Sequence, residues 1–293
     1  MLLKIDHTTV YRYQRPVRFG PHRLMVRAIE GHDVQLRESG LTVEPAGCVR
    51  WLRDVYDNSV AVVDQIEPAA RLSVRSTLLV EQYNTNPFDF VLEPQALEIP
   101  FQYREEERAD VQAFLERGHP ADDDALRHWV RPFLGANGRA RTLEFLTALN
   151  RSVPLFFQYA RREEPGVQSP GETLQRRAGS CRDFALLFME AARMLGLAAR
   201  YVSGYLCRSD EAGTIREASD ATHAWAELYL PGAGWRGFDP TCGMLAADSH
   251  VRVAVARWPG QALPVSGTFQ GSADDYAGLV VTVDARRVVS PSG

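Results

Sequence analysis

Three residues of the sequence, Cys181, His223 and Asp239, have side chains that together could attack an amide carbonyl. In such a set the thiolate is the nucleophile, the imidazolium paired with it protonates the leaving group, and the carboxylate orients the imidazole ring. Singly, each residue has an ordinary alternative: a small buried side chain, a solvated histidine at a strand edge, and an aspartate that opens a turn. The segments around them therefore decide whether they form a site.

Cys181 is predicted to occupy the first position of a helix. Ser180 and Asp183 have the spacing of a capping box at the helix start, and Gly196 is placed to end it. The unpaired N–H groups and the positive end of the helix dipole favour a thiolate at this position, and the N–H of Cys181 could face an oxyanion. The helix itself is predicted from apolar residues spaced three, four and seven apart: Phe184, Leu187, Phe188, Ala191 and Leu195.

His223 and Asp239 are predicted to lie at the two open ends of a β-hairpin. Residues 222–230 alternate as a strand, residues 231–234 supply a Pro-Gly turn, and residues 235–241 form the returning strand. In a hairpin the start of the first strand lies near the end of the second, so the two side chains could lie side by side. The exact register does not follow from the sequence.

The composition describes an ordinary globular protein. Of its 293 residues 45% are hydrophobic and 24% are charged, which suffices for a core without metals or disulfides. The 33 basic and 37 acidic residues give a net charge of −4, so we expect neither a nucleic-acid surface nor a polybasic membrane anchor. The start lacks the pattern of a signal peptide, and we expect a cytoplasmic protein.

The remaining cysteines and histidines show no metal-ligand spacing, so we expect no metal and no cofactor. In a reducing compartment the other thiols are expected to be free and structural. The other histidines are interpreted as structural or solvated. These residues are Cys48, Cys207 and Cys242, and His7, His22, His32, His119, His128 and His250.

The sequence predicts two domains and an α+β fold. Residues 1–100 alternate with period two between Gly, Pro and Asn clusters, which predicts an antiparallel β-sandwich or barrel. Residues 101–293 mix helical segments, such as 142–150, with later strands that include 251–256 and 279–283 in the tail. We assign these tail strands to the second domain.

Several segments resemble bacterial transglutaminase-like proteins, in order and at typical separations. The core segments are 179–185, 199–205, 223–227 and 234–241, and the N-terminal segment 7–13, with residues 16–17 and 22–24, resembles the β domain that precedes this core. The resemblance implies a papain-like core in which Cys181, His223 and Asp239 are nucleophile, base and orienting acid. The chain departs from the family at Arg182, where Gln is frequent, at Cys242, where Asn is usual, and at residues 256–258, where relatives tend to have Gly-Arg-Asp.

The resemblance also implies weaker candidates near the nucleophile. The stretch upstream of the nucleophile in relatives corresponds to residues 157–159, so Gln158 or Tyr159 could donate to the oxyanion, although core packing is favoured for Tyr159. Trp225 and Trp235 could line the substrate cleft, although buried strand aromatics are the more frequent case.

We therefore expect a cysteine-dependent acyl-transfer enzyme that acts on a peptide or protein amide. Hydrolysis, as in a peptidase or amidase, is favoured because excluding water from a thioester requires a dedicated tunnel. The alternatives are a transglutaminase that transfers the acyl group to an amine, and an inactive peptide-binding module that kept the fold. Alkylation of Cys181 by iodoacetamide at mildly acidic pH would separate an enzyme from an inactive module.

Overall fold

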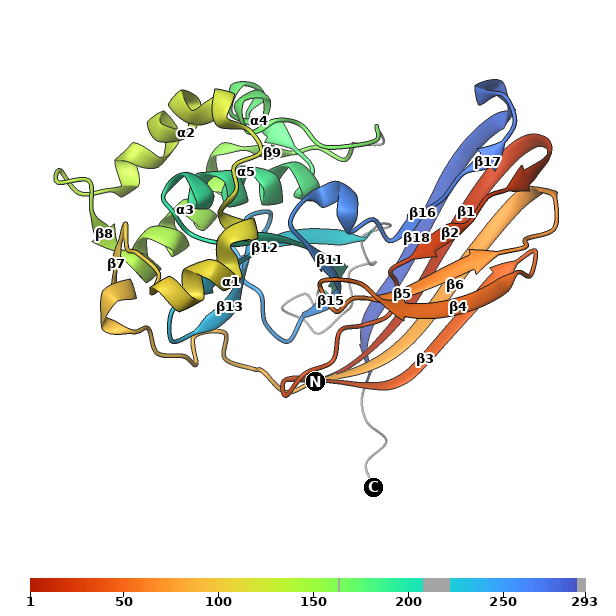
Figure 1. Cartoon of the computed structure of the whole chain (residues 1–293), viewed down its shortest axis with the longest axis horizontal. Coiled ribbons are helices and arrows are strands. Elements are labelled where there is room, and N and C mark those ends of the chain that lie inside the picture. Colours follow the sequence, from red (N-terminus) through yellow and green to blue (C-terminus); the bar gives the residue numbers. More distant parts are fainter. Residues whose placement is uncertain (163, 208–221, 289–293) are drawn as a thin grey trace.

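The computed structural model describes residues 1–162, 164–207 and 222–288 (Figure 1). The helices are α1 (Glu105–Leu115), α2 (Asp123–Val130), α3 (Thr142–Phe156), α4 (Pro170–Arg176) and α5 (Cys181–Met194). The first strands are β1 (Leu2–Phe19), β2 (His22–Leu24), β3 (Val34–Glu44), β4 (Cys48–Arg53), β5 (Ser59–Asp64), β6 (Ala69–Gln82), β7 (Glu98–Ile99), β8 (Ala140–Arg141) and β9 (Gln158–Tyr159). The later strands are β10 (Ala178–Gly179), β11 (Ala199–Leu206), β12 (His223–Leu230), β13 (Gly234–Asp239), β14 (Met244–Leu245), β15 (His250–Ala256), β16 (Val265–Ser266), β17 (Phe269–Gln270) and β18 (Tyr276–Val288).

Two antiparallel sheets form the N-terminal region. The larger has the order β17-β1-β6-β3, with β18 also paired to β1, and the smaller has the order β16-β2-β5-β4. Apolar side chains between them bury a small core that includes Leu24, Val63 and Leu72. The alternation in β1 explains its orientation, because Leu3 and Ile5 are fully buried while Lys4 between them is exposed.

A second region contains the antiparallel sheet β14-β13-β12-β11-β15, with the helices on one side (Figure 1). Helix α5 lies against β11 and β12. Of the apolar stripe predicted for this helix, Phe188 stacks on Phe238 of the sheet with ring centroids 5.5 Å apart, and Phe184 packs against Phe157. The chain is therefore an α+β protein with an N-terminal antiparallel half-barrel and a papain-like core, which confirms the predicted fold class.

The other face of the core sheet packs on the N-terminal sheet. Strands β1, β3, β6 and β18 contribute apolar side chains to this contact from one side, and β11 and β15 contribute them from the other, with Ala28 and Cys207 from the connecting segments. We call this set the interface cluster, and it consists of Leu3, Ile5, Ala28, Val34, Leu78, Val80, Tyr205, Cys207, Val251, Val253, Val283 and Ala285. The core sheet is thus covered on both faces, by α5 on one and by the interface cluster on the other.

The last strand, β18, lies in the sheet of the N-terminal region, whereas the sequence-based division at residue 100 assigns it to the second domain. Strand β15 joins the core sheet as expected, but β18 pairs with β1 along nearly its whole length, for example Ile5 with Ala285. The alternating pattern of residues 279–283 predicts a strand correctly but carries no information on which sheet accepts it. The chain therefore returns to its first strand after completing the core.

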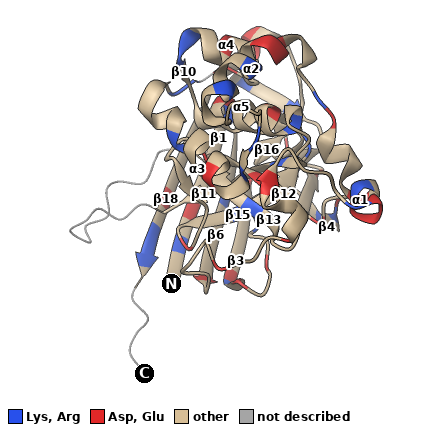
Figure 2. Cartoon of the chain, turned by 90° about the vertical axis from the view of Figure 1, so that its left-hand side faces the viewer, with Lys and Arg blue, Asp and Glu red and all other residues tan. Residues whose placement is uncertain are grey.

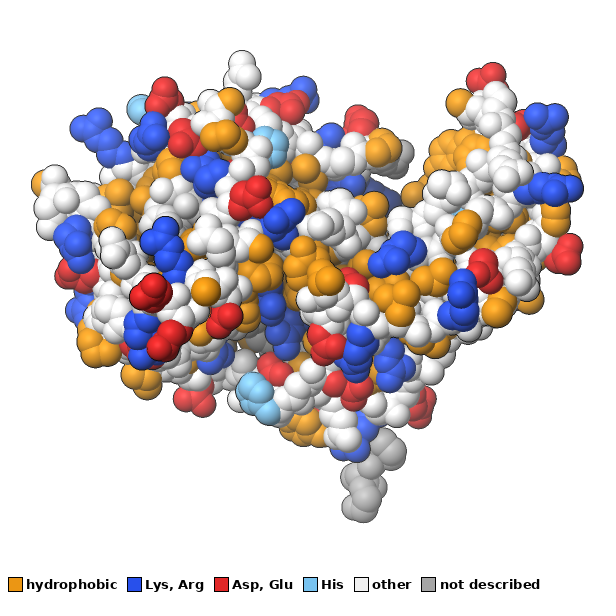
Figure 3. Space-filling model, viewed as in Figure 1, with side chains coloured by type: hydrophobic (Ala, Val, Ile, Leu, Met, Phe, Trp, Pro, Cys, Tyr) orange, Lys and Arg blue, Asp and Glu red, His pale blue; other side chains and the backbone are white. Residues whose placement is uncertain are grey.

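The surface carries both signs of charge over its elements (Figure 2). In the space-filling view, an open notch separates the upper part of the N-terminal sheets from the core (Figure 3). Within the described ranges, each helix is too short or too polar to span a lipid bilayer.

Candidate active site

Cys181 is the first residue of α5, as the sequence predicts. The carboxylate of Asp183 accepts hydrogen bonds through Oδ2 from the N–H and the hydroxyl of Ser180, both at 2.8 Å. Through Oδ1 the same carboxylate accepts from Arg162 and from the N–H of Gln168, so the loop before the helix is tied to the helix start. Gly196 has a φ of +82° and follows the end of the helix. Both ends of α5 are therefore fixed by local sequence.

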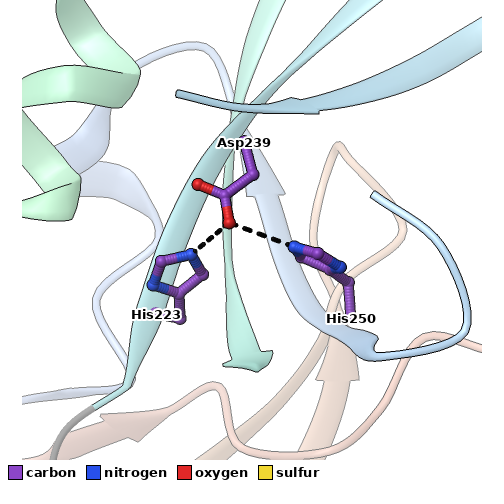
Figure 4. Close-up of side chains that lie close together, drawn as sticks. All are labelled: His223, Asp239 and His250. Atoms are coloured by element: carbon purple, nitrogen blue, oxygen red, sulfur yellow. Dashed lines mark hydrogen bonds and ion pairs between the residues drawn. The ribbon is translucent and has the colours of Figure 1, made fainter. Parts of the chain in front are cut away.

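His223 and Asp239 lie side by side at the open end of the β12–β13 hairpin. The ladder pairs Leu230 with Gly234 and Ala226 with Phe238, so Asp239 falls diagonally next to His223. His223 Nε2 lies 2.8 Å from Asp239 Oδ2 (Figure 4). The hairpin prediction brings these two residues together as expected, and the structure supplies the register that the sequence lacks.

Helix α5 brings Cys181 to the same place. Its packing on β11 and β12 brings the thiol close enough to His223 to raise the pKa of that ring. Because Asp239 occupies Nε2, Nδ1 is the ring nitrogen left for the thiol. Cys181 and His223 are 6% and 7% exposed, and Asp239 is fully buried.

The electrostatics of His223 and Asp239 favour their ionised forms. Burial disfavours the imidazolium, but the charge and hydrogen bond of Asp239, followed by those of Cys181, outweigh it and raise the pKa of His223 to about 10. Burial also opposes ionisation of Asp239, but His223 and then His250 hold the pKa of that carboxyl far below its usual range. At neutral pH the pair is an imidazolium and a carboxylate.

The structure adds a fourth residue, His250, which the sequence interpretation places among the structural or solvated histidines. His250 opens β15, and its Nε2 lies 3.1 Å from the same Asp239 Oδ2 (Figure 4). Strand β15 pairs with β11 at the opposite side of β12 from β13. No local pattern signals this long-range pairing, and this is why the residue was missed.

Comparison with known proteins agrees with this geometry. Residues 133–240, which include all three members of the Cys–His–Asp set, match the transglutaminase-like superfamily. Residues 3–81 match the bacterial transglutaminase-like N-terminal region. The chain belongs to the transglutaminase-like superfamily.

Bacterial proteins share this superfamily organisation over nearly the whole chain. An uncharacterized protein of Mycobacterium tuberculosis is 28% identical over 290 residues, which cover 96% of this chain and 91% of that protein. An uncharacterized protein of Mycobacterium leprae is 25% identical over 294 residues, 96% and 98% of the two chains. The crystal structure of a candidate cysteine protease from Cytophaga hutchinsonii superposes with a TM-score of 0.71 at 20% identity, over 97% of this chain and 90% of that one, and so shares the fold.

The weaker site candidates that the resemblance implies differ in their exposure: Gln158 and Tyr159 lie at the surface, and Trp225 is buried. Gln158 and Tyr159 form β9, which pairs in parallel with β10 directly before α5. Both are exposed, so the packing favoured for Tyr159 is wrong, because β9 lies at the surface. Trp225 is fully buried and stacks on the His223 ring with centroids 6.1 Å apart, so it supports the imidazole. Together with Trp235 it also borders a cavity, but Cys181 does not line that cavity.

The structure shows the contacts of Arg182 and Cys242, two positions at which the sequence departs from the superfamily pattern. Arg182 donates to the backbone carbonyl of Arg162 at 3.1 Å and so ties down the loop before the helix. The N–H of Cys242 donates to Asp239 Oδ1 at 3.3 Å, next to the 2.9 Å bond from the N–H of Thr241. Backbone groups make both bonds to Asp239, so the exchange of Asn for Cys242 preserves them.

Proposed function

We propose that this protein is a cysteine-dependent hydrolase of amide bonds, with Cys181 as nucleophile, His223 as acid and base, and Asp239 as the group that holds the imidazolium. The observation that carries the proposal is the position of His223, with Nε2 2.8 Å from a buried carboxylate and the Cys181 thiol close enough to raise the pKa of the ring. A histidine held in this way can stay charged beside a thiolate and still deliver a proton to a leaving group.

The reaction would begin with attack of the Cys181 thiolate on an amide carbonyl. The S–C bond forms, the carbonyl oxygen takes up the negative charge, and N–H groups at the start of α5 are placed to stabilise it. Collapse of this intermediate breaks the C–N bond, and the proton of the His223 imidazolium goes to the departing amine. A thioester on Cys181 and a neutral His223 remain.

Water would then resolve the thioester. His223 takes a proton from the water while the oxygen attacks the carbonyl carbon, the S–C bond breaks, and the carboxylic acid leaves. The released thiolate and the imidazolium restore the starting state. Asp239 stays ionised throughout and keeps Nε2 protonated, so that proton exchange with the substrate runs through Nδ1.

Hydrolysis is preferred to amine transfer because transfer requires that water be kept from the thioester. In the described part of the chain, neither the cavity between Trp225 and Arg236 nor the groove beside Trp51 is lined by Cys181. Gln158, exposed on β9 beside the start of α5, is the proposed side-chain contact for the substrate or the oxyanion. We propose a peptide or protein as the substrate, since an exposed surface beside a buried dyad suits an extended chain.

A peptide library incubated with the wild-type protein and with Cys181→Ala tests this function. Each arm is run with and without a fluorescent primary amine, and products are identified by mass spectrometry. We expect products that have gained water, in the wild-type arms only. Amine adducts as the main products would show a transglutaminase, and equal turnover by Cys181→Ala would rule out the thiol mechanism.

A further inference from the structure

The Asp239 carboxylate is held by four hydrogen bonds, and a second histidine supplies one of them. Oδ1 accepts from the N–H groups of Thr241 and Cys242, and Oδ2 accepts from His223 and from His250 (Figure 4). The backbone bonds fix one oxygen. The orientation of the other oxygen, which faces His223, depends on His250.

The tautomer of His250 follows from the hydrogen bonds of its other ring nitrogen, Nδ1. The N–H of Ala247 points at His250 Nδ1 from 3.4 Å, and the hydroxyl of Ser249 lies 3.1 Å from the same atom. A backbone N–H can only donate, so Nδ1 is the acceptor and the ring proton is on Nε2. His250 is therefore a neutral ring whose Nε2–H donates to Asp239. Burial agrees with this state, since it lowers the pKa of His250 more than the contact with Asp239 raises it.

The same three side chains have ligand atoms within 4.8 Å of one another, a spacing that a metal ion could also use. A metal at this point would need the lone pair of His250 Nε2. That nitrogen carries the proton as long as Nδ1 accepts from Ala247. The arrangement therefore fits a hydrogen-bond relay better than a metal site.

The position of His250 is set by neighbours outside the Cys–His–Asp set. Gln82, at the end of β6 in the N-terminal sheet, donates to the carbonyl of His250 at 2.7 Å, and both residues are buried. The other end of β15 is held by Asn58, which donates to the carbonyl of Val255 at 2.7 Å and accepts from its N–H at 2.8 Å. The edge of the His250 ring meets Trp225, with ring centroids 5.2 Å apart. A strand clamped at both ends gives the ring little freedom to move away from Asp239.

We propose that His250 is a positioning residue of this site: its Nε2–H orients the carboxylate of Asp239, which in turn holds the imidazolium of His223 next to Cys181. This inference rests on the proposed function. The residue has no contact with the thiol and acts only through Asp239. Without its donor, the buried Oδ2 loses one of its two hydrogen bonds and the carboxylate can turn away from His223.

The test measures the rate at which iodoacetamide alkylates Cys181 at pH 6, followed peptide by peptide with mass spectrometry. This readout needs no substrate, and the exposed Cys48 serves as an internal reference. The variants are His250→Leu and His250→Gln, each in the wild-type and in the Asp239→Asn background. His7→Leu is the matched control, because it removes an equally buried histidine from the N-terminal sheet.

We expect His250→Leu to slow alkylation of Cys181 about 10-fold in the wild-type background and less than about twofold when Asp239 is already Asn, because contacting residues that act through one another are not additive. His250→Gln, whose amide can reach the place of Nε2–H, should stay within about threefold of wild type. His7→Leu should leave the rate unchanged. A simple loss of packing would instead slow both backgrounds equally.

Should His250→Leu fail to fold, His250→Asn replaces it, because its shorter amide does not reach Oδ2 and should behave as Leu is expected to. Equal rates in wild type and His250→Leu, or an equal fall in both backgrounds, would overturn the positioning role. A wild-type Cys181 that reacts no faster than Cys48 would instead overturn the proposed function itself. The two failures are therefore distinguishable.

Discussion

Two parts of the molecule bury the same kinds of titratable side chain and treat them in opposite ways. In the candidate site His223 lies next to the buried Asp239 carboxylate, and its pKa is raised to about 10. In the interface cluster, burial raises the pKa of the Cys207 thiol to about 12, and it lowers to about 4 the pKa of His7, which is hydrogen-bonded to Tyr205 of that cluster. Similar burial thus gives an ion pair in one place and neutral groups in the other.

The partners explain the difference. In the described part of the chain, the hydrogen-bond partners of the His7 ring are neutral: the hydroxyls of Tyr205 at 2.8 Å and Thr9 at 2.9 Å. The carboxylate next to it in the sequence, Asp6, is turned to Arg75 on the outer face of the sheet. Burial alone therefore makes a histidine neutral, and a carboxylate buried with it is needed to keep it charged. Asp239 is the buried carboxylate that meets this requirement for His223.

The largest effect is expected when the nucleophile is removed. Cys181→Ala should abolish turnover, whereas Cys207→Ala should leave turnover largely intact, because burial keeps the thiol of Cys207 protonated and so unreactive. The measurement is kcat/KM for both variants on a substrate found in the peptide library. Ala at Cys48 or Cys242 should also be tolerated. Loss of activity in one of these three, with Cys181→Ala still active, would overturn the assignment.

The next effect concerns the carboxylate. Asp239→Asn should keep the fold and lower kcat/KM by about 10- to 10³-fold, because a neutral amide stabilises the imidazolium less. Serine triads lose about 10⁴-fold in the equivalent change. We expect less here because the thiolate and imidazolium form before attack and the helix start also favours the anion. The pH at which Cys181 alkylation is half-maximal should rise as well. If neither quantity changed, Asp239 would be only a turn residue, and the site a Cys–His dyad.

His7 and His223, both buried, should make the free energy of unfolding depend on pH in opposite ways. His7 is neutral when folded, with a pKa of about 4 against about 6.5 when unfolded, so the unfolded chain binds more protons between these values. Its contribution is complete above pH 6.5 and is lost as the pH falls to 4, at a cost of about 3 kcal/mol. For His223 the folded pKa is the higher one, so its contribution is complete below pH 6.5 and is lost as the pH rises toward 10.

Urea unfolding at several pH values measures how the free energy of unfolding depends on pH and so checks both expectations. His7→Gln should flatten the loss of stability on the acid side and leave the alkaline side unchanged. His223→Gln should do the reverse. Two variants with the same pH dependence as wild type would show that neither histidine differs between folded and unfolded states.

The smallest effect is expected from metal removal. Activity should survive EDTA, because the lone pair that His250 would offer to a metal is protonated and the reaction needs no Lewis acid. The measurement is kcat/KM before and after dialysis against the chelator, followed by addition of single divalent metals. Loss of activity that one metal restores would assign the His223–Asp239–His250 group to that metal instead.

The parts of the site that follow from the sequence are the local ones. The Ser180–Asp183 spacing predicts the helix start, and the turn at residues 231–234 predicts the hairpin that joins His223 to Asp239. His250 does not follow, because it reaches Asp239 through the pairing of β15 with β11, which also shifts register between Ser203 and Gly204. Long-range pairing depends on which faces meet in space, and alternation along one strand does not encode it.

The same reason limits prediction of the fold. The strand pattern of the tail is legible, but its return to β1 is not, since any antiparallel sheet with a free edge would satisfy it. The exposure of Tyr159 likewise depends on which face of β9 is covered, whereas Trp225 is buried, as favoured for a strand aromatic. Sequence alone predicts the elements and the residue types of the site, and the packing decides which side chains meet.

The ionisation state of His223 is the central claim, and nitrogen NMR of the protein labelled with ¹⁵N-histidine measures it directly. At pH 7.5 both ring nitrogens of His223 should carry protons, whereas His7 should show one protonated and one bare nitrogen, as its pKa of about 4 requires. The His223→Gln and His7→Gln variants assign the signals. A neutral His223 ring at this pH would contradict the account, because the thiolate of Cys181 would then lack its partner.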